Sequence, residues 1–194
     1  MKDSIYPQMK IIETDKYIFR PICLDDASNM FEYLSQEEVV RYLPIKIHKS
    51  VIDTKRFIRS YFISSYKRGN INHWAIIDKR NNNLVGNIGF NDISVNDKEG
   101  EIGICINPKY WGHDIATELT KYPLMYGFKF LKLEKIIAIS YEENPKTRKS
   151  LTNCGFKHVK TFNRKLKISN LFKIKKCDKY ELCRKDYILS RFID

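Results

Sequence analysis

The chain has 194 residues and a formal net charge of +12, with 43% hydrophobic and 13% aromatic residues. This length predicts one domain over residues 1–194, with residues 1–10 as a loose lead-in. No apolar run approaches the roughly 20 residues of a membrane-spanning helix, and no secretory signal is visible, so we expect a cytoplasmic protein. The five cysteines are scattered, which predicts neither a disulfide framework nor a metal site.

The positive charge suits a polyanionic partner, such as nucleic acid, the ribosome or a phosphorylated cofactor. A lysine-rich composition also arises from coding bias, so both interpretations stay open. Nucleic acid is the less expected partner, because the chain has no glycine-flanked aromatic motif and no recognisable reading helix.

Helices dominate the first third of the chain. Residues 17–20 form a short predicted strand closed by a proline, and a helix is expected from Asp25 or Asp26. A short helical piece covers 37–43. Ser50 is a good N-cap, with Asp53 three residues on, for a helix that ends near 69.

Strands and turns follow. Residues 73–78 and 84–90 form a predicted hairpin around three consecutive asparagines. Alternation over 101–106 predicts the next strand, which Asn107-Pro108 ends because proline donates no backbone hydrogen bond. A helix is then expected over 115–130, although Pro123 in its middle predicts a kink.

The last part of the chain alternates again. Residues 136–141 are almost all apolar and predict a buried central strand. A helix over 147–153 with Gly155 as its stop comes next, followed by strands over 159–166 and 172–183. The tail carries Tyr187, Ile188, Leu189 and Phe192 for packing. The order of elements predicts an α+β chain around one mixed sheet.

The turn between Ile106 and Glu118 is the most informative stretch. A strand, a glycine-containing turn and a helix start form a natural anion site, because the first helical N–H groups are unpaired and the dipole is positive there. We therefore expect a pyrophosphate to bind at this turn.

The ordered motifs resemble the GNAT superfamily of N-acetyltransferases, and within it the RimJ/RimL-like branch of ribosomal-protein N-terminal acetyltransferases. The motifs that carry the resemblance are 18–21 with 25–27, 39–43, 85–90, 101–103, 110–118, Asn144 with Thr147, Gly155-Phe156, and Asp178, Tyr180, Leu182, Asp186 and Tyr187. The resemblance implies an α+β fold with a mostly antiparallel seven-stranded mixed sheet. That sheet is expected to splay between its fourth and fifth strands, with about four flanking helices.

The resemblance also implies acetyl-CoA as cosubstrate, without a metal. Its pyrophosphate is expected on the amides of 112–117 and its pantetheine arm along 104–107. The predicted cofactor-binding residues are Ile104, Cys105, Ile106, Trp111, Gly112, His113, Asp114, Ile115, Ala116, Thr117 and Asn144.

Asp114 stands where the family usually has glycine. Either its side chain points outward and caps the following helix, or it points inward and weakens CoA binding. We expect the outward arrangement.

The resemblance implies direct attack of an amine on the thioester, without an acyl-enzyme. Glu101 is the predicted general base, with a solvated carboxylate as the alternative role. His73 and His113 are alternative bases, for which structural or solvent-facing roles are expected.

Further candidates concern the departing thiolate and the binding of the acceptor. Leu151 stands where many relatives have a tyrosine that protonates the thiolate. Thr147 is the predicted hydrogen-bond donor to the sulfur, or else a helix cap. Asn144 is expected to hold pantetheine or the splayed strand. The predicted acceptor-binding residues are Tyr42, Trp74, Phe90 and Asn91, of which the two rings also suit a core.

The predicted function is acetyl transfer from acetyl-CoA to a primary amine, with a protein N-terminus, such as that of a ribosomal protein, as the first choice. An α-amino group has a pKa near 8, about two units below that of lysine, so it needs little help to become neutral. A small amine (a polyamine or an antibiotic) and a CoA-binding sensor with weakened catalysis are the alternatives. A monomer and a homodimer are both compatible with the sequence.

Overall fold

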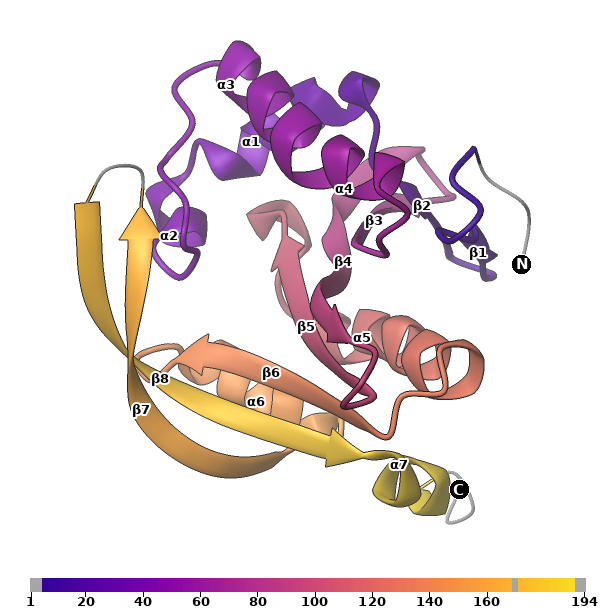
Figure 1. Ribbon diagram of the computed structural model, residues 1–194. Helices are drawn as coiled ribbons and strands as arrows, with labels where there is room; N and C mark the ends of the chain where they lie inside the picture. Colours follow the sequence, from indigo (N-terminus) through magenta and orange to yellow (C-terminus); the bar gives the residue numbers. More distant parts are fainter. Residues whose placement is uncertain (1–4, 169–170, 191–194) are drawn as a thin grey trace. The chain divides into compact units, whose positions relative to one another are not determined.

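The computed structural model describes residues 5–168 and 171–190, which form an α+β fold (Figure 1). Eight strands lie in the order β1-β2-β3-β4-β5-β6-β8-β7. The chain divides into two compact units. The N-terminal unit comprises Met1–Gly89 with Ile104–Gly112, and the C-terminal unit comprises Phe90–Gly103 with His113–Asp194.

The strands of the N-terminal unit are β1 (Ile12–Glu13), β2 (Tyr17–Pro21), β3 (His73–Asp78) and the first half of β4 (Asn83–Ser94). Each pairs with the next in antiparallel fashion. The two-residue β1 raises the strand number from the predicted seven to eight. It was missed because a strand this short has no visible alternation.

The helices of this unit are α1 (Ala27–Leu34), α2 (Glu37–Val40), α3 (Val51–Phe57) and α4 (Ser64–Lys67). A π-helical segment, Ile58–Ile63, joins α3 to α4. Ser50 caps α3 as predicted, because its side chain accepts the N–H of Asp53. Asp26 lies in a 3-10 turn (Leu24–Asp26) before α1 and forms a two-bond ion pair with Arg20, at 2.6 and 2.8 Å.

The predicted loose lead-in at 1–10 is corrected where the structure describes it. Met9 is fully buried, and Gln8 Nε2 donates a 2.8 Å hydrogen bond to the backbone oxygen of Tyr66. Residues 1–4 lie outside the described part of the chain.

The strands of the C-terminal unit are the first part of β5 (Glu99–Ile106), β6 (Lys135–Tyr141), β7 (Lys157–Ile168) and β8 (Leu171–Cys183). The β5–β6 pair is parallel and runs from Glu99↔Lys135 to Ile102↔Ala138. Within the described residues this pairing goes no further, although both strands continue. The end of pairing agrees with the predicted splay between these strands.

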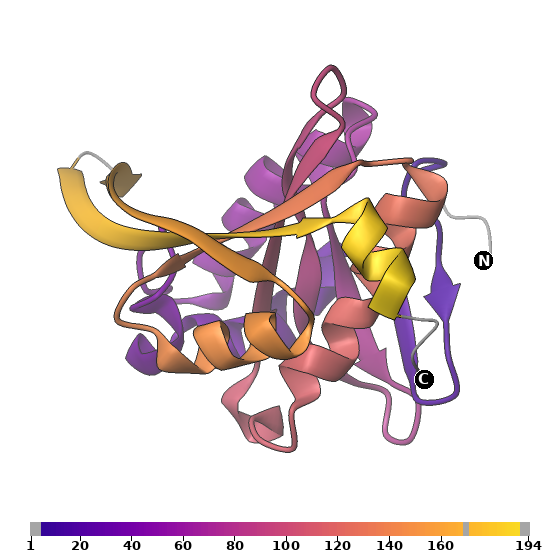
Figure 2. The same ribbon diagram turned by 90° about the horizontal axis from the view of Figure 1, so that it is seen from below.

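Strands β7 and β8 form a long antiparallel hairpin (Figure 2). Residues Cys177–Cys183 of β8 pair with β6. The described residues of β8 before Cys177 pair with β7 alone, so this end of the hairpin is a two-stranded ribbon. Helix α6 (Pro145–Asn153) lies behind β6 in the view of Figure 1.

Helix α5 (Ile115–Met125) contains Pro123 and passes into a π-helical segment, Tyr126–Phe130. Proline has no backbone N–H, so one regular helical hydrogen bond is missing at Pro123. A helix commonly bends or changes its hydrogen-bond pattern near such a position. The last helix is α7 (Arg184–Ser190), whose Tyr187 stacks on Phe128 at 4.8 Å between ring centroids. The predicted packing of Ile188, Leu189 and Phe192 concerns side chains outside the described part of the chain.

Two further findings bear on the sequence predictions. All five cysteines are free. No helix within residues 5–168 and 171–190 combines the length and apolar character needed to cross a membrane.

Candidate active site

The turn before α5 has an unusual backbone. Gly112, His113 and Asp114 have φ angles of 105°, 48° and 51°, so three successive residues are left-handed. Glycine adopts this conformation without strain, and aspartate tolerates it better than most residues. The positive φ at Asp114 would therefore suit glycine better than aspartate.

The predicted capping role of Asp114 is wrong. Its carboxylate is exposed and makes no capping hydrogen bond, while its backbone oxygen accepts the N–H of Glu118 at 3.1 Å. The left-handed backbone explains this, because N-cap side chains normally reach the helix from an extended conformation.

The first turn of α5 has the character expected of an anion site. Its first N–H groups, from Ile115 onward, have no carbonyl partner within a helix. The Thr117 hydroxyl is buried and has no hydrogen-bond partner among the described residues. Because this oxygen has less than 1 Å² of accessible surface, it is closed to a ligand, and the fit to a pyrophosphate rests on the first N–H groups of the helix. The residues present in this turn thus fit a pyrophosphate.

Strand β5 ends in the N-terminal unit beside β4. Gly86 lies so close to β5 that a Cβ there would be 2.3 Å from the Cys105 oxygen. The Asn107 N–H donates to Val85 at 2.9 Å, and Trp111 Nε1 donates to Ile106 at 2.9 Å. Ile104 is half-buried, whereas Cys105 and Ile106 are buried.

The thiol of Cys105 is not a nucleophile candidate. Burial raises its pKa to about 12, so it stays protonated at neutral pH. This state agrees with the expected direct transfer, in which no acyl-enzyme forms.

Glu101 lies in a polar cluster of the C-terminal unit. Asn91 Nδ2 donates to Glu101 Oε1 at 3.1 Å, and Arg164 Nη1 of β7 lies 3.7 Å from the same oxygen. The Glu101 side chain is 16% exposed. Gly103 leaves the room for this arrangement, since a Cβ there would be 2.7 Å from Asn91 Oδ1. The structure thus brings together two predicted residues, Glu101 and Asn91, and adds Arg164.

The start of α6 decides which residue caps the helix. Asn144 Oδ1 accepts the Thr147 N–H at 3.2 Å, so Asn144 caps the helix and Thr147 does not. The Thr147 hydroxyl has no hydrogen bond within the described chain, and its hydrogen bond to a thiolate stays a prediction. Leu151 lies on the buried face of α6.

Two predicted acceptor-binding residues are core residues. Trp74 and Phe90 are both 0% exposed, and the Trp74 indole donates to the Lys10 oxygen at 2.9 Å. Their burial contradicts a role in contacting an acceptor. Tyr42 is half-buried under the Arg41 guanidinium, 5.2 Å from its ring centroid.

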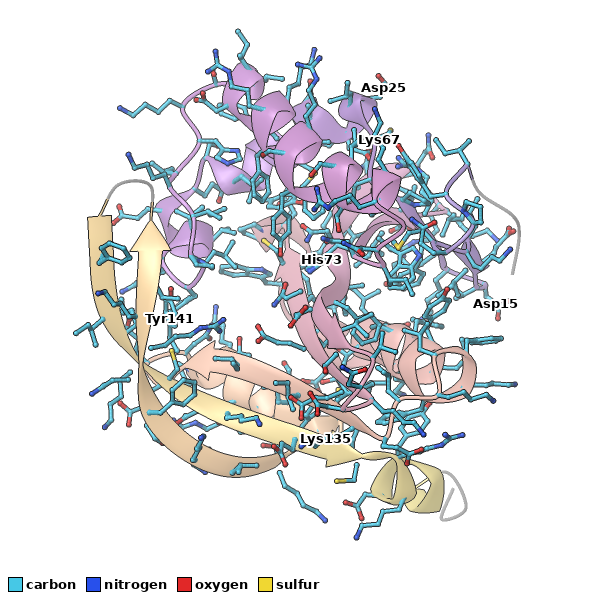
Figure 3. The ribbon with its side chains drawn as sticks, in the orientation of Figure 1. Asp15, Asp25, Lys67, His73, Lys135 and Tyr141 are labelled. Carbon is cyan, nitrogen blue, oxygen red and sulfur yellow. The ribbon has the colours of Figure 1, made fainter. Side chains whose placement is uncertain are left out.

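His73, labelled in Figure 3, belongs to a buried polar chain in the N-terminal unit. Tyr33 Oη donates to Asn87 Oδ1 at 2.9 Å, and Asn87 Nδ2 donates to His73 Nδ1 at 2.8 Å. His73 is only 5% exposed and contacts the Phe62 ring. These contacts support the expected structural role. The other candidate histidine, His113, is exposed.

A second carboxylate cluster, absent from the predicted site, surrounds Asp178 of β8. Its Oδ1 accepts the Thr161 hydroxyl at 2.6 Å, and its Oδ2 lies 3.2 Å from Arg148 of α6. The Thr161 hydrogen bond, together with those from His158 and Arg148, holds the pKa of Asp178 below its ordinary value despite burial. No sequence spacing indicates this cluster or Arg164, because the partners come from different elements.

Comparison with known proteins decides the family. The acetyltransferase (GNAT) domain profile matches residues 16–157. An uncharacterised N-acetyltransferase of Bacillus subtilis, YoaA, is 31% identical over 146 residues, covering 75% of this chain and 82% of its own. The chain belongs to the GNAT acetyltransferase family. It is an acyltransferase with the GNAT fold.

Two solved structures share this fold. Spermidine N-acetyltransferase from Vibrio cholerae, in complex with CoA and spermine, has a TM-score of 0.75 and 18% identity, covering 90% of this chain and 99% of its own. Ribosomal-protein-S5-alanine acetyltransferase from Vibrio fischeri has a TM-score of 0.72 and 18% identity, with coverages of 92% and 98%. At this identity, the likeness speaks for the fold and not for the acceptor.

Proposed function

We propose that this chain transfers the acetyl group of acetyl-CoA to the α-amino group of a protein N-terminus, as a RimJ/RimL-like enzyme of the cytoplasm. The observation that carries the proposal is the Glu101 carboxylate, held by Asn91 in a largely shielded position on β5. A carboxylate fixed in this way suits the removal of a proton from an amine. Free cysteines suit a reducing compartment.

Acetyl-CoA supplies an activated thioester. The α5 start, with its unpaired first N–H groups, suits its pyrophosphate. In the transfer, the amine nitrogen forms a bond to the acetyl carbon, the carbon–sulfur bond breaks, and CoA leaves as a thiolate. Glu101 accepts the amine proton, directly or through a water molecule. Residues 1–194 act as one catalytic domain in this proposal.

An α-amino acceptor is favoured over a small polyamine by charge. The chain has a net charge of +12, and Arg164 lies 3.7 Å from the proposed base. A polyamine carries several positive charges, so this surface repels it more strongly than it repels a single α-amino group. Polyamine acetylation remains the second candidate, because the family includes proteins named as spermidine acetyltransferases.

The test is acetyl-CoA turnover, followed by thiol release, on a panel of N-terminal peptides, spermidine and an aminoglycoside. Turnover on peptides with a free α-amine, and none on the same peptides after N-terminal blocking, is the expected result. Spermidine as the best substrate would support the second candidate. Tight CoA binding without turnover on any amine would mean a sensor.

A further inference from the structure

The charge of the chain is concentrated on the β7–β8 hairpin. Residues 157–183 contain nine lysines and arginines and only two acidic residues, a net of +7 out of +12 for the whole chain. These 27 residues are a small fraction of the 194, so coding bias, which acts on the whole chain, does not explain the excess. A local excess of this size selects among charged partners.

The face of the hairpin that carries Arg164 brings part of this charge to the proposed base. Arg164 Nη1 lies 3.7 Å from Glu101 Oε1, and the Arg164 side chain is 40% exposed. Arg164 is directly opposite Lys175 in the register, and directly opposed residues share a face. Lys173, two residues before Lys175 in β8, lies on that same face.

The guanidinium has capacity for another partner. Its contact with Glu101 is long for an ion pair and leaves part of the fork exposed. Arginine has five N–H donors in a geometry that matches carboxylates. By contrast, Lys175 is already paired with Glu143 at 2.8 Å. Arg164 is therefore the group best suited to recognise an acceptor carboxylate beside the reacting amine.

We propose that the acceptor is a polypeptide N-terminus followed by acidic side chains, and that Arg164 is the residue that selects it. This inference rests on the proposed function and narrows its substrate class. The α-amine lies at Glu101, and a carboxylate one or two residues along the peptide reaches the guanidinium. A lysine at the same peptide position meets Arg164 and the basic face, which repel it.

The test compares three peptides that differ only at positions two and three: Ser-Asp-Asp, Ser-Asn-Asn and Ser-Lys-Lys, each followed by the same neutral tail. The wild type is expected to show a kcat/KM about tenfold higher on the acidic peptide than on the neutral one, and lowest on the basic one. Raising salt from about 50 to 300 mM should shrink these ratios, because Arg164 is partly exposed.

Variants then assign the preference to one residue. Arg164→Gln should bring the acidic-to-neutral ratio close to one, Arg164→Lys should keep part of it, and Arg164→Glu should favour the basic peptide. For each variant, the rates on the acidic and basic peptides are divided by the rate of that same variant on the neutral peptide, so that a general loss of activity cancels. Lys165→Gln is the matched control: it removes the same charge one residue along β7, from the opposite face, and should keep the ratio.

The two possible failures differ in appearance. If neutral peptides are acetylated but the acidic peptide has no advantage, or if Lys165→Gln abolishes the advantage as strongly as Arg164→Gln, the inference is overturned and the proposed function stands. If no peptide of any charge is acetylated while a small amine is, the proposed function itself fails.

Discussion

Asn91 holds Glu101 by a 3.1 Å hydrogen bond from its side-chain amide to the carboxylate oxygen Oε1. Both residues belong to the C-terminal unit, and Gly103 leaves the amide its room. The hydrogen bond fixes one oxygen and leaves Oε2 as the more available proton acceptor. The cluster thus positions a base without neutralising it.

Glu101→Gln should lower kcat about 10- to 100-fold at pH 7 with unchanged CoA affinity, because the amide cannot take the amine proton. The defect should narrow toward pH 9, where the α-amine is already neutral. Steady-state rates from pH 6 to 9 measure this. Glu99→Gln, on the same strand and paired with Lys135 at 2.7 Å, is the control and should keep its turnover. Equal rates for wild type and Glu101→Gln across that range would remove Glu101 as the base.

Substitution of Asp114 separates charge from backbone conformation. Asp114→Asn keeps the tolerance for φ 51° and removes one negative charge from the turn, so CoA should bind about threefold tighter at low salt. Asp114→Gly should bind at least as tightly, because it also removes the strain. Calorimetric titration with CoA measures both variants. If only the glycine variant gains affinity, the backbone and not the charge limits binding.

Asp178 makes stability depend on acid. Its pKa is held below the ordinary value, chiefly by the Thr161 hydrogen bond, so its contribution is complete above about pH 4 and is lost as pH falls further. Asp178→Asn should cost about 1–3 kcal/mol in the free energy of unfolding at pH 7 and reduce the acid dependence. Urea unfolding between pH 3 and 7 measures both effects.

A matched surface pair provides the control for Asp178. Asp186→Asn breaks the pair of Asp186 with the exposed Lys157, at 3.1 Å, and should change stability by less than about 1 kcal/mol. Equal losses in the two variants would contradict the importance of the buried cluster.

The close approach of β4 and β5 predicts a severe steric effect. Gly86→Ala places a Cβ 2.3 Å from the Cys105 oxygen, which forces the strands apart and should destabilise the protein by about 3 kcal/mol or more. Gly69→Ala is the control, because nothing lies within 4 Å of its added Cβ and only its φ of +81° resists the change, at about 1 kcal/mol. Thermal unfolding of the two variants should therefore rank them in this order.

Elements with a strong periodic pattern were predictable from the sequence. The strand over 136–141 is β6, and the helix expected over 115–130 corresponds to α5 and its π-helical continuation. Turn chemistry was also informative, since Ser50 caps α3 as expected. The burial of Trp74 and Phe90 was not decided by pattern, because an aromatic residue on a strand suits a pocket as well as a core.

The parts of the site that sequence could not predict depend on long-range geometry. Arg164 is 63 positions from Glu101 along the chain, and their 3.7 Å contact requires β7 to be folded against the rest of its unit. The role of Asn144 as the cap of α6 was missed for a different reason. Asparagine in a loop before a proline fits both a cap and a ligand contact; the 3.2 Å bond from the Thr147 N–H to Oδ1 shows the cap, and the expected contact of Asn144 with pantetheine stays a prediction.

The left-handed run at Gly112, His113 and Asp114 has a consequence for how distant relatives are found. What such a turn demands is a backbone angle, and glycine, asparagine and aspartate all meet that demand to some degree. Substitutions among these three can therefore accumulate while the path of the chain into α5 persists. A sequence search that requires glycine at every position of this turn would miss proteins in which the backbone conformation is retained but the residue types differ.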